Sequence, residues 1–128
     1  MTAKRVLVVE DRPEILELML LGLEGAGFEV EAALNGREAL EVQQRRAVDV
    51  VITDIFMPEM DGIETIDRIR AEYPDTRIIA MACGGERKQD YLKVARQIGA
   101  HATLAKPFAT ADLLRLVRML MLEKPGAS

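Results

Sequence analysis

The chain has 128 residues, 49% hydrophobic and 30% charged, so it is long enough for one domain with a buried core and too apolar for a disordered segment. Seventeen basic and 21 acidic side chains give a net charge of −4, which argues against the clustered basic surface that nucleic-acid binding needs. The lone cysteine, Cys83, forms no internal disulfide, and the apolar run Val6–Val9 is too short for a membrane span. We therefore expect a cytoplasmic protein with neither nucleic-acid nor membrane partners.

Short β-branched runs alternate with longer segments of helical period. In chain order we expect a strand at 6–9, a helix from Pro13 to just before Gly27, a strand at 28–34, a helix at 37–46, a strand from Val48 that ends at Asp54, a helix at 63–73, a strand at 77–82, a helix through 91–98, a strand at 103–105 and a helix at 110–123. The expected domain thus covers residues 1–123 and leaves 124–128 as a short tail without an output domain.

The residue patterns of these elements indicate the kind of sheet. Val6–Val9 is an unbroken apolar run, as in a central parallel strand covered on both faces. Residues 28–34 alternate between apolar and polar, which predicts a half-exposed strand nearer an edge. Strands that alternate with helices throughout predict an α/β fold with a doubly wound parallel sheet.

Three acidic residues come at the carboxyl ends of expected strands, where open parallel sheets bind ligands. Glu10 and Asp11 follow the first strand, and Asp54 ends the third. If these strands are neighbours, the carboxylates converge, and their mutual repulsion must be relieved by protonation or by a cation. Hard oxygen ligands in a solvent-facing cleft suit Mg²⁺. The sequence after the first strand lacks the glycines of a dinucleotide site.

Lys106 comes at the end of the fifth expected strand and is followed by Pro107. A lysine at this position can reach an anionic ligand in the same cleft. An aspartate held between a bound dication and an ammonium group is a suitable nucleophile for phosphoryl transfer, which makes Asp54 the candidate.

Several separated motifs, in order and spacing, resemble the response-regulator receiver family over nearly the whole chain. They are Val8-Val9-Glu10-Asp11, Asp54-Ile55-Phe56-Met57-Pro58 with Asp61-Gly62, and Gly99-Ala100 leading to Lys106-Pro107-Phe108. The resemblance implies a flavodoxin-like sheet with strand order 2-1-3-4-5. It also implies a phosphoacceptor signalling domain of two-component systems rather than an enzyme, with only self-catalysed phosphorylation and slow autodephosphorylation.

The resemblance assigns a role to each residue of the acidic site. Asp54 accepts the phosphoryl group; Asp11, Asp54 and the backbone carbonyl of Phe56 bind Mg²⁺, with Glu10 acting through water; Lys106 contacts the phosphoryl group, and its peptide bond to Pro107 is cis. The implied donor is a sensor histidine kinase or a phosphotransfer protein. A downstream protein target would bind the fourth helix, fifth strand and fifth helix, and pairing of two copies through the last two helices is a further expectation.

Two positions depart from the family pattern. Ala82 stands where the family usually has Thr or Ser, whose hydroxyl bonds the phosphoryl oxygen, and Thr103 stands where it often has Tyr or Phe. Two alternatives to a phosphorylated switch therefore stay open. One is a pseudo-receiver that binds partners without phosphorylation. The other is a phosphoaspartate hydrolase, although Phe56 occupies the place of that class's second aspartate.

Overall fold

The computed structural model describes residues 4–56, 62–83 and 88–122, in which strands and helices alternate. The elements are β1 (Arg5–Val9), α1 (Pro13–Gly25), β2 (Glu29–Ala33), α2 (Gly36–Arg45), β3 (Val50–Asp54), α3 (Gly62–Glu72), β4 (Arg77–Cys83), α4 (Lys88–Ile98), β5 (Ala102–Lys106) and α5 (Thr110–Leu122). They agree with the predicted order of elements. The predicted tail, 124–128, lies outside the described residues.

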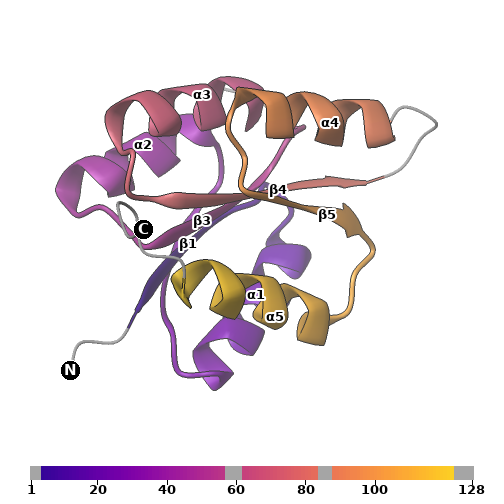
Figure 1. The fold of residues 1–128 in the computed structure, drawn as a ribbon. Coiled ribbons are helices and arrows are strands. Elements are labelled where there is room, and N and C mark those ends of the chain that lie inside the picture. Colours follow the sequence, from indigo (N-terminus) through magenta and orange to yellow (C-terminus); the bar gives the residue numbers. More distant parts are fainter. Residues whose placement is uncertain (1–3, 57–61, 84–87, 123–128) are drawn as a thin grey trace.

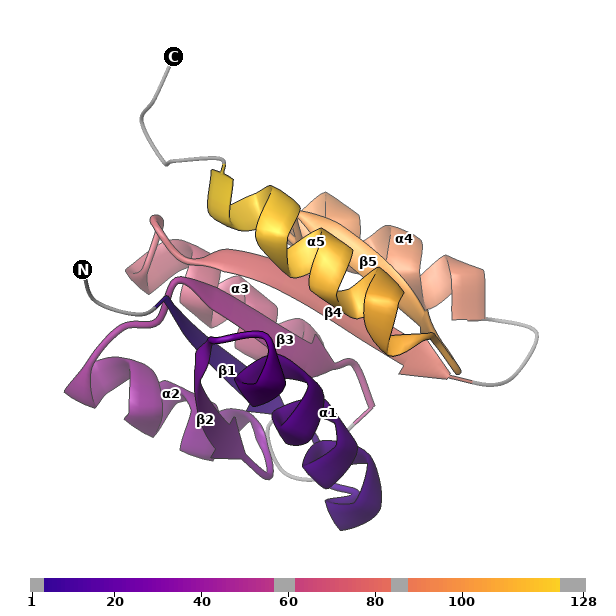
Figure 2. The same ribbon diagram turned by 90° about the horizontal axis from the view of Figure 1, so that it is seen from below.

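The strands form one parallel sheet in the order β2-β1-β3-β4-β5, which confirms the predicted fold class and strand order. Helices α2, α3 and α4 cover one face of this sheet, and α1 and α5 cover the other (Figures 1 and 2). The chain passes from β1 to β2 on one side and then to β3 on the other, so the strand order reverses at β1. The neighbouring carboxyl ends of β1 and β3 therefore form the topological switch point, where such sheets bind ligands.

Each face of the sheet has its own apolar core. Alternate residues of the central strands contribute to opposite cores, because successive side chains of a strand point to opposite faces. The core under α2, α3 and α4 includes Leu7, Val9, Val51, Ile66, Ile78, Ala80 and Leu92. The core under α1 and α5 includes Val6, Val8, Leu16, Val50, Ile52, Leu104 and Leu113.

Burial along the strands follows their place in the sheet. Every residue of β1 and β3 is buried, whereas β2 exposes Glu29 and Ala32 at the sheet edge. This difference confirms the prediction of a central strand at Val6–Val9 and of an edge strand at 28–34, which the structure places at Glu29–Ala33. The continuous apolar runs reflect cover on both faces, and the alternating run reflects cover on one.

Local signals in the sequence also mark the ends of helices. Pro13 occupies the first turn of α1, where its missing N–H costs no helical hydrogen bond. Gly27, two residues beyond α1, has φ +96°, a backbone conformation that favours glycine. Asn35 caps α2, since its side-chain Oδ1 accepts a 2.9 Å hydrogen bond from the backbone N–H of Glu38.

His101 takes part in the pairing of β4 and β5 although it lies outside both strands. It is half-buried just before β5, and its Nδ1 accepts a 3.0 Å hydrogen bond from the backbone N–H of Ile78. Its own backbone N–H donates to the Ile78 carbonyl at 2.8 Å. His101 thus extends the pairing between β4 and β5 by one position, which the apparent loop sequence around it does not indicate.

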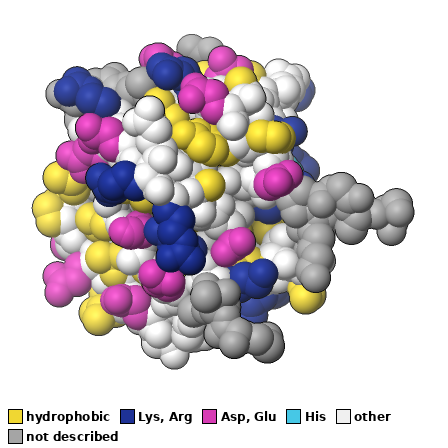
Figure 3. All heavy atoms as spheres, turned by 90° about the vertical axis from the view of Figure 1, so that its left-hand side faces the viewer, with side chains coloured by type: hydrophobic (Ala, Val, Ile, Leu, Met, Phe, Trp, Pro, Cys, Tyr) yellow, Lys and Arg dark blue, Asp and Glu magenta, His cyan; other side chains and the backbone are white. Residues whose placement is uncertain are grey.

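Helices long and apolar enough to cross a membrane are absent from the part of the chain that the structure describes. On the molecular face in Figure 3, described basic and acidic side chains are interspersed, and apolar side chains occur in small groups between them.

Candidate functional site

Along β1, β3 and β5, every second residue points toward α1 and α5, and these residues are apolar within the strand. At the carboxyl end of each strand, the next residue in this series is polar: Glu10, Asp54 or Lys106. Glu10 follows Val6 and Val8 at alternate positions, and Asp54 follows Val50 and Ile52 in the same way. Lys106 follows Ala102 and Leu104 in β5. Because side chains alternate between the two faces of a strand, all three project from the same face and meet at the carboxyl ends of the strands.

Lys106 joins the two carboxylates directly. Its Nζ lies 2.6 Å from Oδ2 of Asp54 and also donates to Oε1 of Glu10. Since β4 lies between β3 and β5, roughly 10 Å separates the two strands, and the long lysine side chain spans that distance. The exposed fractions are 0% for Glu10, 5% for Asp54 and 7% for Lys106. The Lys106–Pro107 peptide bond is cis, as the family resemblance implies.

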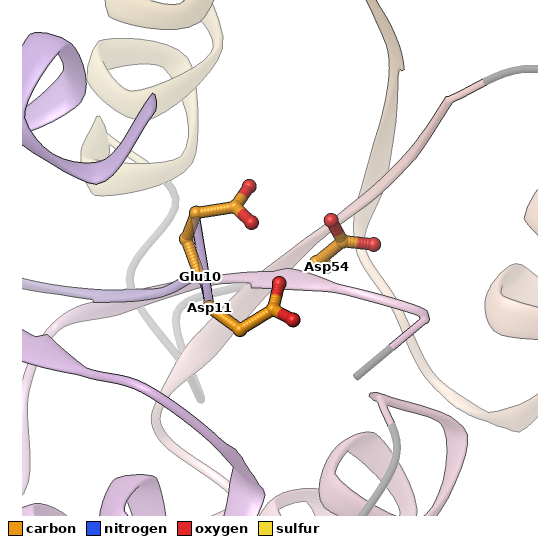
Figure 4. A group of neighbouring side chains, drawn as sticks. All are labelled: Glu10, Asp11 and Asp54. Carbon is orange, nitrogen blue, oxygen red and sulfur yellow. The ribbon is translucent and has the colours of Figure 1, made fainter. Parts of the chain in front are cut away.

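Asp11 completes the acidic cluster from the solvent side. Glu10, Asp11 and Asp54 each place one carboxylate oxygen within 4.8 Å of the others, and their side chains gather at the ends of β1 and β3 (Figure 4). Unlike the other two, Asp11 is exposed. Two oxygens bound to one Mg²⁺ are at most about 4.2 Å apart, so the cluster needs only a small adjustment, or a bridging water, to share one ion. The donor set therefore fits Mg²⁺.

Burial and charge act in opposite directions on the ionisable groups of this site. Burial raises the pKa of Glu10 above its ordinary value of 4.5, although the hydrogen bond and charge of Lys106 lower it. Burial lowers the pKa of Lys106, but its hydrogen bonds to Asp54 and Glu10, together with their charges, outweigh burial and raise it above 10.5. Lys106 is therefore a fixed cation at neutral pH.

The backbone around Asp54 is held by close contacts. The backbone N–H of Phe56 donates to Oδ1 of Asp54 at 3.0 Å, so both carboxylate oxygens of Asp54 accept hydrogen bonds. Further along, the N–H of Gly62 donates to the Ile55 carbonyl at 2.9 Å. A Cβ on Gly62 would lie 2.5 Å from Cα of Ile55 and nearer still to the Asp54 carbonyl oxygen. Only glycine therefore fits at the start of α3.

The two positions that depart from the family pattern lie outside this hydrogen-bonded group. Ala82, near the end of β4, is buried in the core under α2, α3 and α4 and offers only a methyl group. Thr103 is half-buried and lines a recess of about 280 Å³ together with the α4 residues Gln89, Asp90, Leu92, Lys93 and Arg96. Gly84 and Gly85, which follow β4, lie outside the described residues.

Sequence reasoning brought together Glu10, Asp11, Asp54 and Lys106, but it missed the contacts of neighbouring residues. The backbone N–H of Arg12 donates to Oε2 of Glu10 at 3.2 Å. The ring of Phe56 contacts the ring of Tyr91 in α4, with centroids 4.6 Å apart. The sequence carries no signal for either contact, because each depends on how a loop turns after its strand.

Comparisons with known proteins agree with this geometry. The family model described as "Response regulator receiver domain" matches residues 6–118. A 14.6 kDa protein of Leptolyngbya boryana is 33% identical over 94% of this chain and 92% of its own length. The transcriptional regulatory protein PrrA of Mycobacterium tuberculosis is also 33% identical over 94% of this chain, which spans only 51% of PrrA.

Solved structures show the same fold. The chemotaxis response regulator CheY4 of Vibrio cholerae matches with a TM-score of 0.84 and 33% identity, over 93% of this chain and 99% of that chain. A CheY-like receiver domain protein of Methanospirillum hungatei matches with a TM-score of 0.87 and 27% identity, over 94% of each chain. The chain belongs to the receiver domain family of two-component response regulators.

Proposed function

We propose that this receiver accepts a phosphoryl group on Asp54 from a histidine kinase or a phosphotransfer protein, in a Mg²⁺-dependent reaction. The observation that carries the proposal is the setting of Asp54: its buried carboxylate accepts a hydrogen bond from the Lys106 ammonium and lies in one cluster with the exposed Asp11 carboxylate. An aspartate next to both a fixed cation and a cation-binding acid meets the requirements of phosphoryl transfer.

The proposed reaction changes few bonds. A carboxylate oxygen of Asp54 forms a bond to phosphorus while the bond from phosphorus to the donor's imidazole nitrogen breaks. The nitrogen keeps the electron pair, and the imidazole takes up a proton. Lys106, which now donates to Oδ2 of Asp54, would donate to an oxygen of the arriving phosphoryl group, and the N–H of Phe56 would hold the other carboxylate oxygen.

Receiver domains generally bind Mg²⁺ in an acidic pocket. In this chain the ligands would be the Asp11 and Asp54 carboxylates and the backbone carbonyl of Phe56, with Glu10 acting through water. When bound, the ion offsets negative charge on the phosphoryl oxygens. Glu10 is buried and bonded to Lys106 and the Arg12 N–H, which supports an indirect rather than a direct role for this carboxylate.

A phosphodonor must dock close to Asp54, and a recess lies beside Lys106, the lysine that is hydrogen-bonded to Asp54. It has a volume of about 520 Å³, opens beside Lys106 and is lined mainly by apolar side chains of α1 and of the segment that leads into α5. Its lining residues are Arg12, Ile15, Leu18, Met19, Lys106, Pro107, Phe108, Thr110 and Leu113. We infer that a donor protein covers this recess while its phosphorylated side chain approaches Asp54.

We also propose that the domain, residues 1–123, acts on its own and signals by binding a protein target. The near-complete overlap with the Leptolyngbya boryana protein and with CheY4 supports this, whereas the overlap with half of PrrA would fit a domain joined to an output domain. Exposed apolar side chains support a target surface on α4 and α5: they are Val94, Met119 and Leu122.

Intact mass spectrometry tests the central proposal. The protein is incubated with Mg²⁺ and acetyl phosphate, with Asp54→Asn and an EDTA-treated sample as controls. We expect a gain of one phosphoryl group that is labile to base, present in the wild type and absent from both controls. A wild type that gains no phosphoryl group would instead favour the pseudo-receiver.

Specific observations bear on the two alternatives. Ala82 offers no hydroxyl group and Thr103 no aromatic ring, which favours a pseudo-receiver. The buried cluster of Glu10, Asp54 and Lys106 opposes it, because a site without chemistry has no need for buried like charges. A hydrolase would need a second carboxylate at position 56, where the structure has the phenyl ring of Phe56.

A further inference from the structure

The ring of Phe56 links the loop after β3 to helix α4. Phe56 comes two residues after Asp54, its side chain is 46% exposed, and its ring contacts Tyr91 with centroids 4.6 Å apart and planes at 83°. This edge-to-face arrangement is a preferred geometry for aromatic pairs. We propose that Tyr91 is a positioning residue, which holds Phe56 against Asp54 and carries the phosphorylation state of Asp54 to α4. The inference rests on the proposed function.

The link to Asp54 runs through the backbone of Phe56. Its N–H donates to Oδ1 of Asp54 at 3.0 Å, so this amide responds directly to the charge on that oxygen. When Oδ2, the oxygen that accepts from Lys106, forms the bond to phosphorus, the carboxylate becomes an acyl phosphate and Oδ1 becomes an uncharged carbonyl oxygen, which is a weaker acceptor. The best position of the Phe56 amide therefore differs between the two states, and the phenyl ring moves with its own backbone.

The link to the rest of the molecule runs through Tyr91. This residue is half-buried in α4 and packs against the core that contains Leu92 and Ala95 of the same helix. A shift of the Phe56 ring therefore acts on a side chain that is anchored in α4, rather than on one that moves independently in solvent. The exposed Val94 lies on the same helix, so such a shift reaches a surface that a partner can bind.

The side chains at positions 82 and 103 offer no comparable link. Ala82 has only a methyl group inside the core, and Thr103 faces the recess under α4 instead of the carboxylates. Among the described residues, the ring contact between Phe56 and Tyr91 begins only two residues after Asp54. A two-state response of α4 needs contacts that differ between the states, and this pair supplies one at the site itself.

The composition of the chain permits a direct spectroscopic test. It has no tryptophan and two tyrosines, so a Tyr73→Phe variant leaves Tyr91 as the sole tyrosine fluorophore. The probe is Mg²⁺ with beryllofluoride, a stable mimic of the phosphoryl group. We expect the emission of Tyr91 to change on addition of the probe, and the change to disappear when Phe56→Leu or Asp54→Asn is added to the Tyr73→Phe background.

Amide chemical shifts then test whether the signal reaches α4. With the same probe we expect shifts over residues 88–98 in the wild type, at least a twofold reduction in Tyr91→Leu, and recovery in Tyr91→Phe, which keeps the ring. Phe56→Leu breaks the same contact from a half-exposed side chain and serves if Tyr91→Leu does not fold. Equal α4 shifts in the wild type and the ring-deleted variant would overturn the inference.

The two proposals fail in different ways. If the wild type gains a phosphoryl group on Asp54 but its α4 shifts do not depend on Tyr91, the inference is wrong and the proposed function stands. If the wild type gains no phosphoryl group, the proposed function fails, and the inference with it.

Discussion

Lys106 sets the electrostatic balance of the site at the scale of single residues. The carboxylates of Glu10, Asp11 and Asp54 carry three formal negative charges and Lys106 one positive charge, which leaves a net formal charge of −2 at the site. Glu10 and Asp54 are both buried, and removing the cation from a buried ionic group leaves charges that neither water nor protein compensates. Lys106 thus stabilises the fold as well as the proposed reaction.

Lys106→Met should therefore destabilise the protein, by roughly 3–5 kcal/mol at neutral pH. The loss depends on pH through Glu10. Its pKa is raised by burial above the ordinary 4.5, and the loss of Lys106, which lowers this pKa, raises it further. Charging Glu10 then costs stability, a cost that is absent below pH 4.5 and grows as the pH rises through the raised pKa. The difference from wild type should accordingly shrink in acid.

Urea unfolding followed by far-ultraviolet circular dichroism at pH 4.5 and 7.5 measures this difference. Lys93→Met is the matched control, because Lys93 is an exposed lysine on α4, and its free energy of unfolding should stay within about 0.5 kcal/mol of wild type. A Lys106→Met variant as stable as wild type at pH 7.5 would show that the buried carboxylates are not dependent on this lysine.

Gly62 is the second residue whose identity the site requires. A methyl group there would overlap the backbone of Asp54 and Ile55, which cannot move without displacing the carboxylate. Gly62→Ala should cost roughly 1–3 kcal/mol and slow phosphorylation of Asp54. Gly25→Ala is the control, since a Cβ at the end of α1 meets no atom within 4 Å, and it should be neutral or slightly stabilising. Equal stability of the two variants would contradict the close approach seen here.

At the scale of elements, a buried polar network joins α2 to the residues just before β3 and β4. It lies at the amino ends of the strands, whereas Asp54 lies at their carboxyl ends. Gln43 of α2 accepts a 2.7 Å hydrogen bond from the N–H of Val48 and donates to Thr76 Oγ1 at 3.1 Å. The hydroxyl of Thr76 donates in turn to the Val48 carbonyl at 2.9 Å. Gln43 and Thr76 are almost fully buried, so these hydrogen bonds have no competition from water.

Gln43→Leu should destabilise the protein by roughly 1–3 kcal/mol, because it leaves the buried N–H of Val48 without an acceptor. The yield of phosphorylated protein should not change, since the network lies far from the carboxyl ends of the strands. Its neighbour Gln44 is exposed, so Gln44→Leu controls for helix propensity and added hydrophobicity. Thermal unfolding measures the stability of both variants. A lower phosphorylation yield in Gln43→Leu would show that the amino and carboxyl ends of the strands are coupled.

The elements themselves were largely predictable, because their signals are local. Burial on both faces accounts for the continuous apolar runs Val6–Val9 in β1 and Val50–Ile52 in β3, and Pro13 and Gly27 mark the limits of α1. The pairing of His101 with Ile78 was not predictable, since a strand neighbour contributes that hydrogen bond from 23 residues away. Local pattern indicates where a strand begins only to within a residue or two.

At the scale of the whole molecule, the strand alternation also explains why the site could be predicted. Glu10, Asp54 and Lys106 stand in the next core-facing positions of their strands, so the sheet order alone brings them together. The contact between Phe56 and Tyr91 could not be predicted in this way. It depends on the path of a loop and on the rotation of α4, and neither follows from a period of two or 3.6 residues.

Mg²⁺ binding provides a test that involves the stability of the whole molecule. A ligand that binds only the folded state stabilises it, and at about 100 times its Kd the gain is roughly 2.7 kcal/mol. We expect Mg²⁺ to raise the free energy of unfolding by this route and EDTA to reverse it. Asp11→Asn should remove most of the gain, because Asp11 is the exposed member of the carboxylate cluster and the one an ion reaches first.

Asp75→Asn makes the same chemical change at an exposed position just before β4, at the amino ends of the strands and so at the opposite end from Asp11. It should keep the full Mg²⁺ gain, so a comparison of the two variants separates a site from a general effect of lowering the negative charge. The measurement is thermal unfolding over a series of Mg²⁺ concentrations at constant ionic strength. If Asp11→Asn and Asp75→Asn respond equally to Mg²⁺, the ion screens the surface and the carboxylate cluster does not bind it.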